Sequence, residues 1–143
     1  LADKYGIAAD VWSATSYNEL RRDCLMVERW NMLHPGEPPR RSYLNEALRS
    51  ETGPFIASSD YMKAVPDQIA KWVPGGLTTL GTDGFGRSES RAALRRHFEV
   101  DAEHIAIAAM HALARQGKLD DGAVRRAISD LGVDPETTDP MLA

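Results

Sequence analysis

The hydrophobic positions of the chain fall into short β-type runs separated by longer stretches with helical spacing. Three runs predict strands, at residues 10–15, 55–58 and 77–80. Strands that alternate with helices are typical of an α/β fold with a largely parallel sheet. The hydrophobic pattern therefore predicts an α/β protein built as a three-layer sandwich.

Capping residues mark where several helices begin. Ser16 and Glu19 have the spacing of a capping box, and the helix they predict ends at the proline-rich loop 34–39. Asp60 is the predicted cap of a later helix, which Pro66 interrupts. The other predicted helices cover residues 42–48, which Ser42 starts, 89–98, 102–116 with Asp101 as its cap, and 121–131.

The first residues read as the end of a helix that glycine closes at Gly6. A helix without a beginning favours a fragment of a longer polypeptide. We therefore expect a domain that is incomplete at its start.

A turn with three glycines joins the run 77–80 to a basic helix, and Ser88 followed by Glu89 has the pattern of that helix's cap. In an open α/β sheet, such a turn lies at the carboxyl end of a strand, where ligands and partner surfaces usually sit. We predict an interface of the domain or of a subunit here. The predicted interface residues are Thr82, Asp83, Gly84, Phe85, Gly86, Arg87, Ser88 and Arg91.

Arg87, Arg91 and Arg95 recur at intervals of four, which places them on one face of the helix after the turn. An anion or an acidic partner could dock on that face. The alternative is a solvated face whose arginines form ion pairs within the chain. The sequence leaves both interpretations open.

Length and composition narrow the class of protein. With 143 residues, 43% hydrophobic and 27% charged, the chain has the size and composition of one soluble domain. A net charge of -4 gives no reason to expect nucleic acid, and the apolar runs are too short to span a membrane. The single cysteine, Cys24, and the absence of a basic-then-apolar leader predict a cytoplasmic protein.

No catalytic or metal-binding cluster is predicted. His104 and His111 are separated on one helix by a rise of about 10 Å, which is too far for one tetrahedral ion. Cys24 lies on the apolar face of a helix, where a small core residue is expected. The three tryptophans are dispersed, and we expect each to be a packing residue.

Four segments, in order, carry a resemblance to a known family. They are Glu-Arg-Trp-Asn-Met-Leu-His-Pro at 28–35, Ser-Asp-Tyr-Met-Lys at 59–63, the glycine turn at 81–91, and His-Phe-Glu-Val-Asp at 97–101. The chain resembles the carboxy-terminal domain of the decarboxylating component of the pyruvate dehydrogenase complex, homodimeric bacterial type. Ser59, where threonine is expected, and Arg41-Ser42 depart from the family pattern and affect only the choice of subgroup.

The resemblance implies a fold and a function. Residues 1–143 are expected to form a transketolase-like carboxy-terminal domain that lacks its first strand. The full enzyme is expected to bind thiamine diphosphate and magnesium, to decarboxylate pyruvate, and to acetylate the lipoyl group of the dihydrolipoyl acyltransferase component. Its other expected partners are the upstream catalytic domains and the second subunit of a homodimer.

Within that family, this chain is expected to support the dimer and to contribute no catalytic residues. The thiamine diphosphate motif needs an asparagine after Gly-Asp-Gly, whereas Thr82-Asp83-Gly84 has none downstream. A dinucleotide loop at residues 84–89 is disfavoured because Glu89 replaces the last glycine and would repel a pyrophosphate. The alternatives are a free-standing interaction module and the equivalent domain of another 2-oxo acid dehydrogenase.

Overall fold

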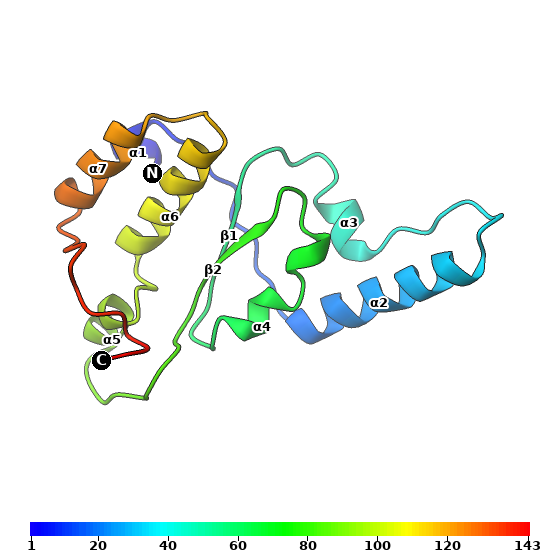
Figure 1. The fold of residues 1–143 in the computed structure, drawn as a ribbon, viewed down its shortest axis with the longest axis horizontal. Helices are drawn as coiled ribbons and strands as arrows, with labels where there is room; N and C mark the ends of the chain where they lie inside the picture. Colours follow the sequence, from blue (N-terminus) through cyan, green and yellow to red (C-terminus); the bar gives the residue numbers. More distant parts are fainter.

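Two short strands run side by side through the middle of the molecule, with helices on either side (Figure 1). The computed structural model describes residues 1–143. Strand β1 (Phe55–Ser58) pairs in parallel with β2 (Leu77–Leu80), with Phe55 opposite Leu77 and Ser58 opposite Leu80. The two runs and the parallel arrangement predicted from the sequence are therefore confirmed, in a sheet of two strands.

The strand predicted at residues 10–15 is wrong. None of the backbone hydrogen bonds outside the helices and strands involves this segment, and strand pairing is confined to β1 and β2. Val11 is 96% exposed and Trp12 is 57% exposed, so Trp12 is not a packing residue within this chain. The residue types of this segment favour a strand. A strand also requires a hydrogen-bonded neighbouring strand, and residues 10–15 have none in this chain.

One group of helices packs an apolar cluster beside the sheet. It comprises α2 (Tyr17–Leu33), α3 (Tyr43–Ala47), α4 (Ala64–Asp67) and the short 3-10 helix η1 (Ala70–Trp72). The cluster contains Cys24, Leu44, Leu48, Ile69 and Val73, against which Phe55 and Leu77 of the strands also pack. Cys24 is 1% exposed, which confirms its predicted place in the core.

A second apolar cluster lies among the helices on the other side. These helices are α1 (Ala2–Tyr5), α6 (Ala102–Arg115) and α7 (Asp121–Asp130), and α6 also packs on both strands. The buried residues of this cluster are Met110, Val124 and Ala127. A single core was expected from the length of the chain, but only 14 of the 143 residues are buried, and they form two separate clusters and a few isolated sites.

Three of the predicted helix starts are confirmed by their caps. Ser16 Oγ accepts from Glu19 N–H at 3.3 Å, Ser42 Oγ accepts from Asn45 N–H at 3.1 Å, and an Asp101 carboxylate oxygen accepts from His104 N–H at 3.0 Å. Each cap satisfies a backbone donor that has no partner inside the helix. Local side-chain chemistry therefore fixes these three starts.

Two predicted caps are wrong. Helix α5 (Arg91–His97) begins after Ser90, whose hydroxyl accepts from Ala93 N–H at 3.3 Å, and not after Ser88. Asp60 caps no helix, because α4 begins at Ala64 without a side-chain cap. The backbone carbonyl of Asp60 is instead bonded to the glycine turn, which holds residues 59–63 outside any helix.

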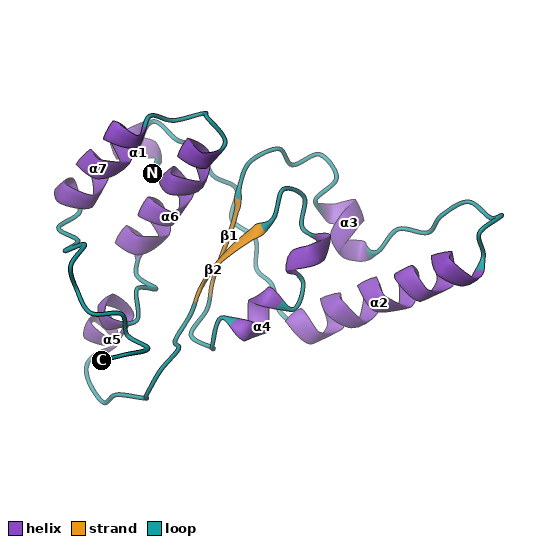
Figure 2. Ribbon diagram, in the orientation of Figure 1, coloured by secondary structure: helices purple, strands orange, loops and turns teal.

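The rest of the chain consists of loops and turns, which Figure 2 distinguishes from the helices and strands. The tail from residue 134 onwards consists of turns and loop residues. It returns toward α5, so that the carboxyl terminus lies close to that helix in Figure 1. No helix is both long enough and apolar enough to span a membrane.

A glutamate occupies the position after α5 at which glycine is usual. Val100 N–H donates to the Arg95 carbonyl at 2.9 Å and Glu99 N–H to the Arg96 carbonyl at 3.2 Å, the two bonds of a Schellman motif. In that motif Glu99 adopts a φ of 58°, the left-handed region that a residue with a Cβ enters at a cost. The end of α5 is therefore strained at one residue.

Replacing Glu99 by glycine is expected to stabilise the chain. Glycine removes the Cβ repulsion but is more flexible when unfolded, so we expect Glu99→Gly to raise the free energy of unfolding by about 1 kcal/mol. Equilibrium denaturation in urea measures the change. Glu99→Ala is the matched control, since it keeps the Cβ, and an equal gain in that variant would contradict the explanation by backbone strain.

Candidate functional site at the glycine turn

The two loops that follow the strands meet because parallel strands end at the same edge of a sheet. Ser59 N–H donates to the Leu80 carbonyl at 3.1 Å, and Thr82 N–H donates to the Tyr61 carbonyl at 3.0 Å. The Thr82 hydroxyl donates to the Asp60 carbonyl at 2.7 Å. The glycine turn is thus bonded along one side to residues 59–61, which belong to another of the segments that carried the family resemblance.

A side-chain contact extends this bonding. An Asp83 carboxylate oxygen accepts from Lys63 N–H at 3.0 Å, and its other oxygen lies 4.0 Å from Lys63 Nζ. Gly81 is buried against the same loop, and a Cβ on it would come within 2.6 Å of the Tyr61 carbonyl and 2.8 Å of Lys63 N. Only glycine permits this approach of two backbones.

The next glycines of the turn differ in what they require. Gly84 has a φ of +97°, and a Cβ there would come within 2.5 Å of the Pro140 carbonyl. Gly86 has neither a positive φ nor any neighbour within 4 Å of an added Cβ. Gly84 therefore serves the shape of the turn, and nothing within this chain requires glycine at position 86.

The predicted interface residues divide into two groups. Thr82 and Asp83 are half-buried and bonded to the preceding loop, so they hold the turn in place. The exposed residues are Gly84, Phe85, Gly86, Arg87, Ser88 and Arg91. Phe85 is 83% exposed, which leaves an aromatic side chain at the outside of the turn. Aromatic residues are enriched at protein–protein interfaces, so Phe85 is compatible with the predicted contact.

An open cavity of about 450 Å³ lies behind the turn and against α5. Arg87, Arg91 and Arg95 all line it, but Arg87 precedes α5, so the predicted shared helix face is wrong for Arg87 and holds only for Arg91 and Arg95. Its apolar lining comes from Leu94 and the buried Phe98 and Val100.

Two carboxylates also line the cavity, those of Asp60 and Glu89. Arg95 Nε lies 4.0 Å from Asp60 Oδ1, a contact at the limit of an ion pair between two exposed side chains. Glu89 Oε1 accepts from Ser90 N–H at 2.7 Å. Sequence reasoning did not assign Asp60 to this site, because it is 35 positions from Arg95 and no local pattern relates them.

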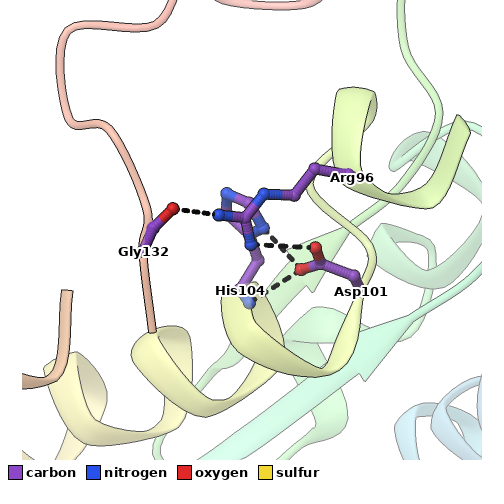
Figure 3. A network of polar contacts seen from close by, with 4 residues as sticks. All are labelled: Arg96, Asp101, His104 and Gly132. Carbon is purple, nitrogen blue, oxygen red and sulfur yellow. Dashed lines mark hydrogen bonds and ion pairs between the residues drawn. The ribbon is translucent and has the colours of Figure 1, made fainter. Parts of the chain in front are cut away.

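A polar network fixes α5, and with it the wall of the cavity (Figure 3). Arg96 donates to the Asp101 carboxylate at 3.1 Å and also to the Gly132 carbonyl, beyond the end of α7. His104 Nδ1 lies 2.5 Å from the other Asp101 oxygen. Figure 3 shows the Arg96 guanidinium between Asp101 and Gly132, so one side chain links α5, α6 and the segment after α7.

The same network changes the acidity of Asp101. Burial alone would raise the pKa of this carboxyl, but hydrogen bonds from the backbone and ring of His104 and from Arg96 outweigh it, and the pKa is lowered. Asp101 is therefore held as a carboxylate that caps α6 and receives Arg96. The charge supports the position of α5, and Asp101 does not line the cavity.

Comparisons with known proteins agree with the predicted resemblance. Residues 1–101 match the family described as the transketolase-like TK C-terminal domain. The chain is 53% identical over 142 residues to the pyruvate dehydrogenase E1 component of Pseudomonas aeruginosa, and 46% identical over 144 residues to that of Escherichia coli. The E1 component of Mycobacterium tuberculosis is 47% identical over 146 residues.

These matches cover almost all of the chain, from 98% to 100% of it, but the chain spans only 16% of the length of each of these relatives. The resemblance to the carboxy-terminal region of pyruvate dehydrogenase E1 components, predicted from four short segments, is confirmed. Because the family profile matches most of the chain and the parallel strands and flanking helices form a mixed α/β structure, the protein belongs to the family of transketolase-like C-terminal domains.

Proposed function

We propose that this chain is the carboxy-terminal domain of a pyruvate dehydrogenase E1 component, acetyl-transferring, that decarboxylates pyruvate in the cytoplasm. The observation that carries the proposal is the identity of 46% to 53% over essentially the whole chain to proteins of that name from separate bacteria. Unrelated domains of one fold do not share identity at that level. The equivalent domain of another 2-oxo acid dehydrogenase is the competing assignment.

In this proposal the chain supports the enzyme structurally, and the thiamine diphosphate and magnesium are held by residues outside it. The Asp83 carboxylate, the nearest match to a metal-binding aspartate, is already bonded to Lys63 N–H. Its surroundings therefore do not fit a diphosphate-bound metal ion. No residue of this chain is assigned a catalytic step.

The exposed part of the glycine turn at Phe85 and Ser88, which do not line the cavity, is the proposed contact with a second subunit or with the upstream catalytic domains. Phe85 supplies an exposed aromatic side chain, and the hydrogen bonds of Thr82 and Asp83 keep the turn in one shape. A preorganised loop loses less conformational entropy on association. The dihydrolipoyl acyltransferase component is a further proposed partner, without an assigned surface.

The proposal also includes a layered sheet larger than the pair seen in this chain. Helices lie on both sides of β1 and β2 (Figure 2), which supports a three-layer sandwich.

Activity of the full-length polypeptide tests the function. We expect it to release carbon dioxide from pyruvate and to acetylate a lipoyl domain when thiamine diphosphate and magnesium are present. Branched-chain 2-oxo acids and 2-oxoglutarate, assayed in parallel, should react at least tenfold more slowly in kcat/KM. Preference for either of those substrates would assign the domain to another 2-oxo acid dehydrogenase.

A parallel titration tests the role of the chain itself. Calorimetry of residues 1–143 with thiamine diphosphate and magnesium is expected to show no binding, because no complete cofactor motif is present. Micromolar binding by the chain alone would contradict its assignment as a structural domain.

A further inference from the structure

Two arginines at the cavity behind the glycine turn have no partner in the chain. Arg87 and Arg91 form none of the side-chain hydrogen bonds or ion pairs of the structure, although both line the cavity. The predicted alternative, in which the three arginines form ion pairs within the chain, therefore applies only to Arg95 and its 4.0 Å contact with Asp60. Two guanidinium groups are left free to bind an anion.

The charge of the lining favours an anionic ligand. Three arginines face two carboxylates, which leaves an excess of one positive charge. Glu89 is oriented by its bond to Ser90 N–H, and Asp60 is on the side of Arg95, so neither is hydrogen-bonded to Arg87 or Arg91. Guanidinium groups bind carboxylate and phosphate oxygens in pairs, which gives such sites both affinity and orientation.

The size and the apolar lining restrict the ligand further. A volume of about 450 Å³ is that of a pocket for a small organic molecule and is far larger than one inorganic ion needs. Leu94 offers an apolar surface beside the arginines, and the small exposed parts of Phe98 and Val100, 8% and 6%, complete the apolar lining. The lining suits a molecule with an anionic head and an apolar body.

The walls of the cavity are held by bonds that do not use the free arginines. The Arg96 network joins α5 to α6, and Thr82 and Asp83 bond the turn to the preceding loop. Substituting Arg87 or Arg91 should therefore alter the ligand site and leave the fold intact. A loss of ligand binding in such a variant can therefore be distinguished from a loss of folding.

We propose that the cavity lined by Arg87, Arg91 and Arg95 binds a small organic dianion, either a phosphate monoester or a dicarboxylate with an apolar body. Arg87 and Arg91 receive the anionic head, and Leu94 with Phe98 and Val100 contacts the body. The site lies outside any thiamine diphosphate motif and does not depend on the decarboxylation proposed above.

The test uses the full-length polypeptide saturated with thiamine diphosphate and magnesium, so that a diphosphate site is already filled. Phenyl phosphate and phenylsuccinate are the two probes, and benzamide is the neutral control, in calorimetric titrations at low salt. We expect saturable binding of at least one anionic probe and none of benzamide. The probe that binds more tightly identifies the head group as phosphate or dicarboxylate.

Variants then locate the binding. The double variant Arg87→Gln/Arg91→Gln should weaken the bound probe tenfold or more, and Arg91→Lys should weaken it less. Arg125→Gln, at an exposed arginine of α7 that does not line the cavity, is the matched control and should leave the affinity unchanged. Unfolding midpoints equal to that of the parent protein would show that each variant is folded.

Two results would overturn the proposal. One is the absence of binding by both anionic probes in the folded, cofactor-saturated protein. The other is binding that the double variant and the Arg125→Gln control alter to the same extent, because the ligand would then occupy another site. Neither result depends on the rate of pyruvate decarboxylation, so the proposed function is tested separately.

Discussion

Valine in place of Gly84 is expected to destabilise the chain by about 2–3 kcal/mol, because a β-branched residue is strained at positive φ. The native φ is +97°, and the Cβ would also press on the Pro140 carbonyl, 2.5 Å away. The turn or the carboxyl-terminal tail must move to relieve the contact. Equilibrium denaturation in urea measures the loss.

Gly86→Val is the matched control for this substitution. The same side chain enters the same turn two positions later, where φ is not positive and no atom lies within 4 Å of the new Cβ. Its free energy of unfolding should stay within about 0.5 kcal/mol of the parent. Equal losses in the two variants would contradict the assignment of the glycine requirement to Gly84.

The variants Gly84→Val and Gly86→Val also test the proposed interface in the full-length protein. If the exposed side of the turn contacts a second subunit, Gly86→Val should weaken the dimer in analytical ultracentrifugation while the folded subunit keeps its stability. A Gly86→Val protein that dimerises as tightly as the parent would place the subunit contact elsewhere. The binding of thiamine diphosphate, measured where the dimer is intact, should be unchanged in both variants.

Alanine in place of Asp101 is the second large expected effect, a loss of about 2–3 kcal/mol at neutral pH. The substitution removes the cap of α6 and leaves Arg96 without its carboxylate partner. Asp101→Asn is the informative comparison, since asparagine can still cap the helix but carries no charge. It should retain part of the stability that alanine loses.

The stability lost in Asp101→Ala should also depend on pH, in the direction that the pKa shift of Asp101 determines. The pKa of Asp101 is lower in the folded chain than the value of about 3.9 for an unfolded aspartate. The carboxylate therefore contributes its full stabilisation above pH 4 or so, and that contribution is lost as the pH falls through the folded pKa. Urea denaturation between pH 7 and pH 2 tests whether the free energies of unfolding of the parent and of Asp101→Ala converge as the pH falls. A difference that stays constant across this range would assign the effect to packing.

The sequence by itself determined the elements whose signals are local. Ser16, Ser42 and Asp101 were identified as caps because a cap and the backbone donor it satisfies lie two or three positions apart. The two parallel strands and the family resemblance were also readable, since both rest on contiguous residues. The glycine turn and the spacing of its arginines indicated where a site would form.

Tertiary structure decided everything that depends on partners distant in sequence. Residues 10–15 have strand composition but no pairing partner, so their backbone has no ladder to join. Position 84 requires glycine, and position 86 does not, only because of the local φ and the approach of Pro140. Asp60 caps no helix: its carbonyl accepts from the Thr82 hydroxyl, and its carboxylate lies 4.0 Å from Arg95 Nε. Arg87 and Arg91 form no side-chain hydrogen bond or ion pair. Local hydrogen bonds can be read from spacing, whereas the packing of remote segments determines which side chains meet and which charges stay free.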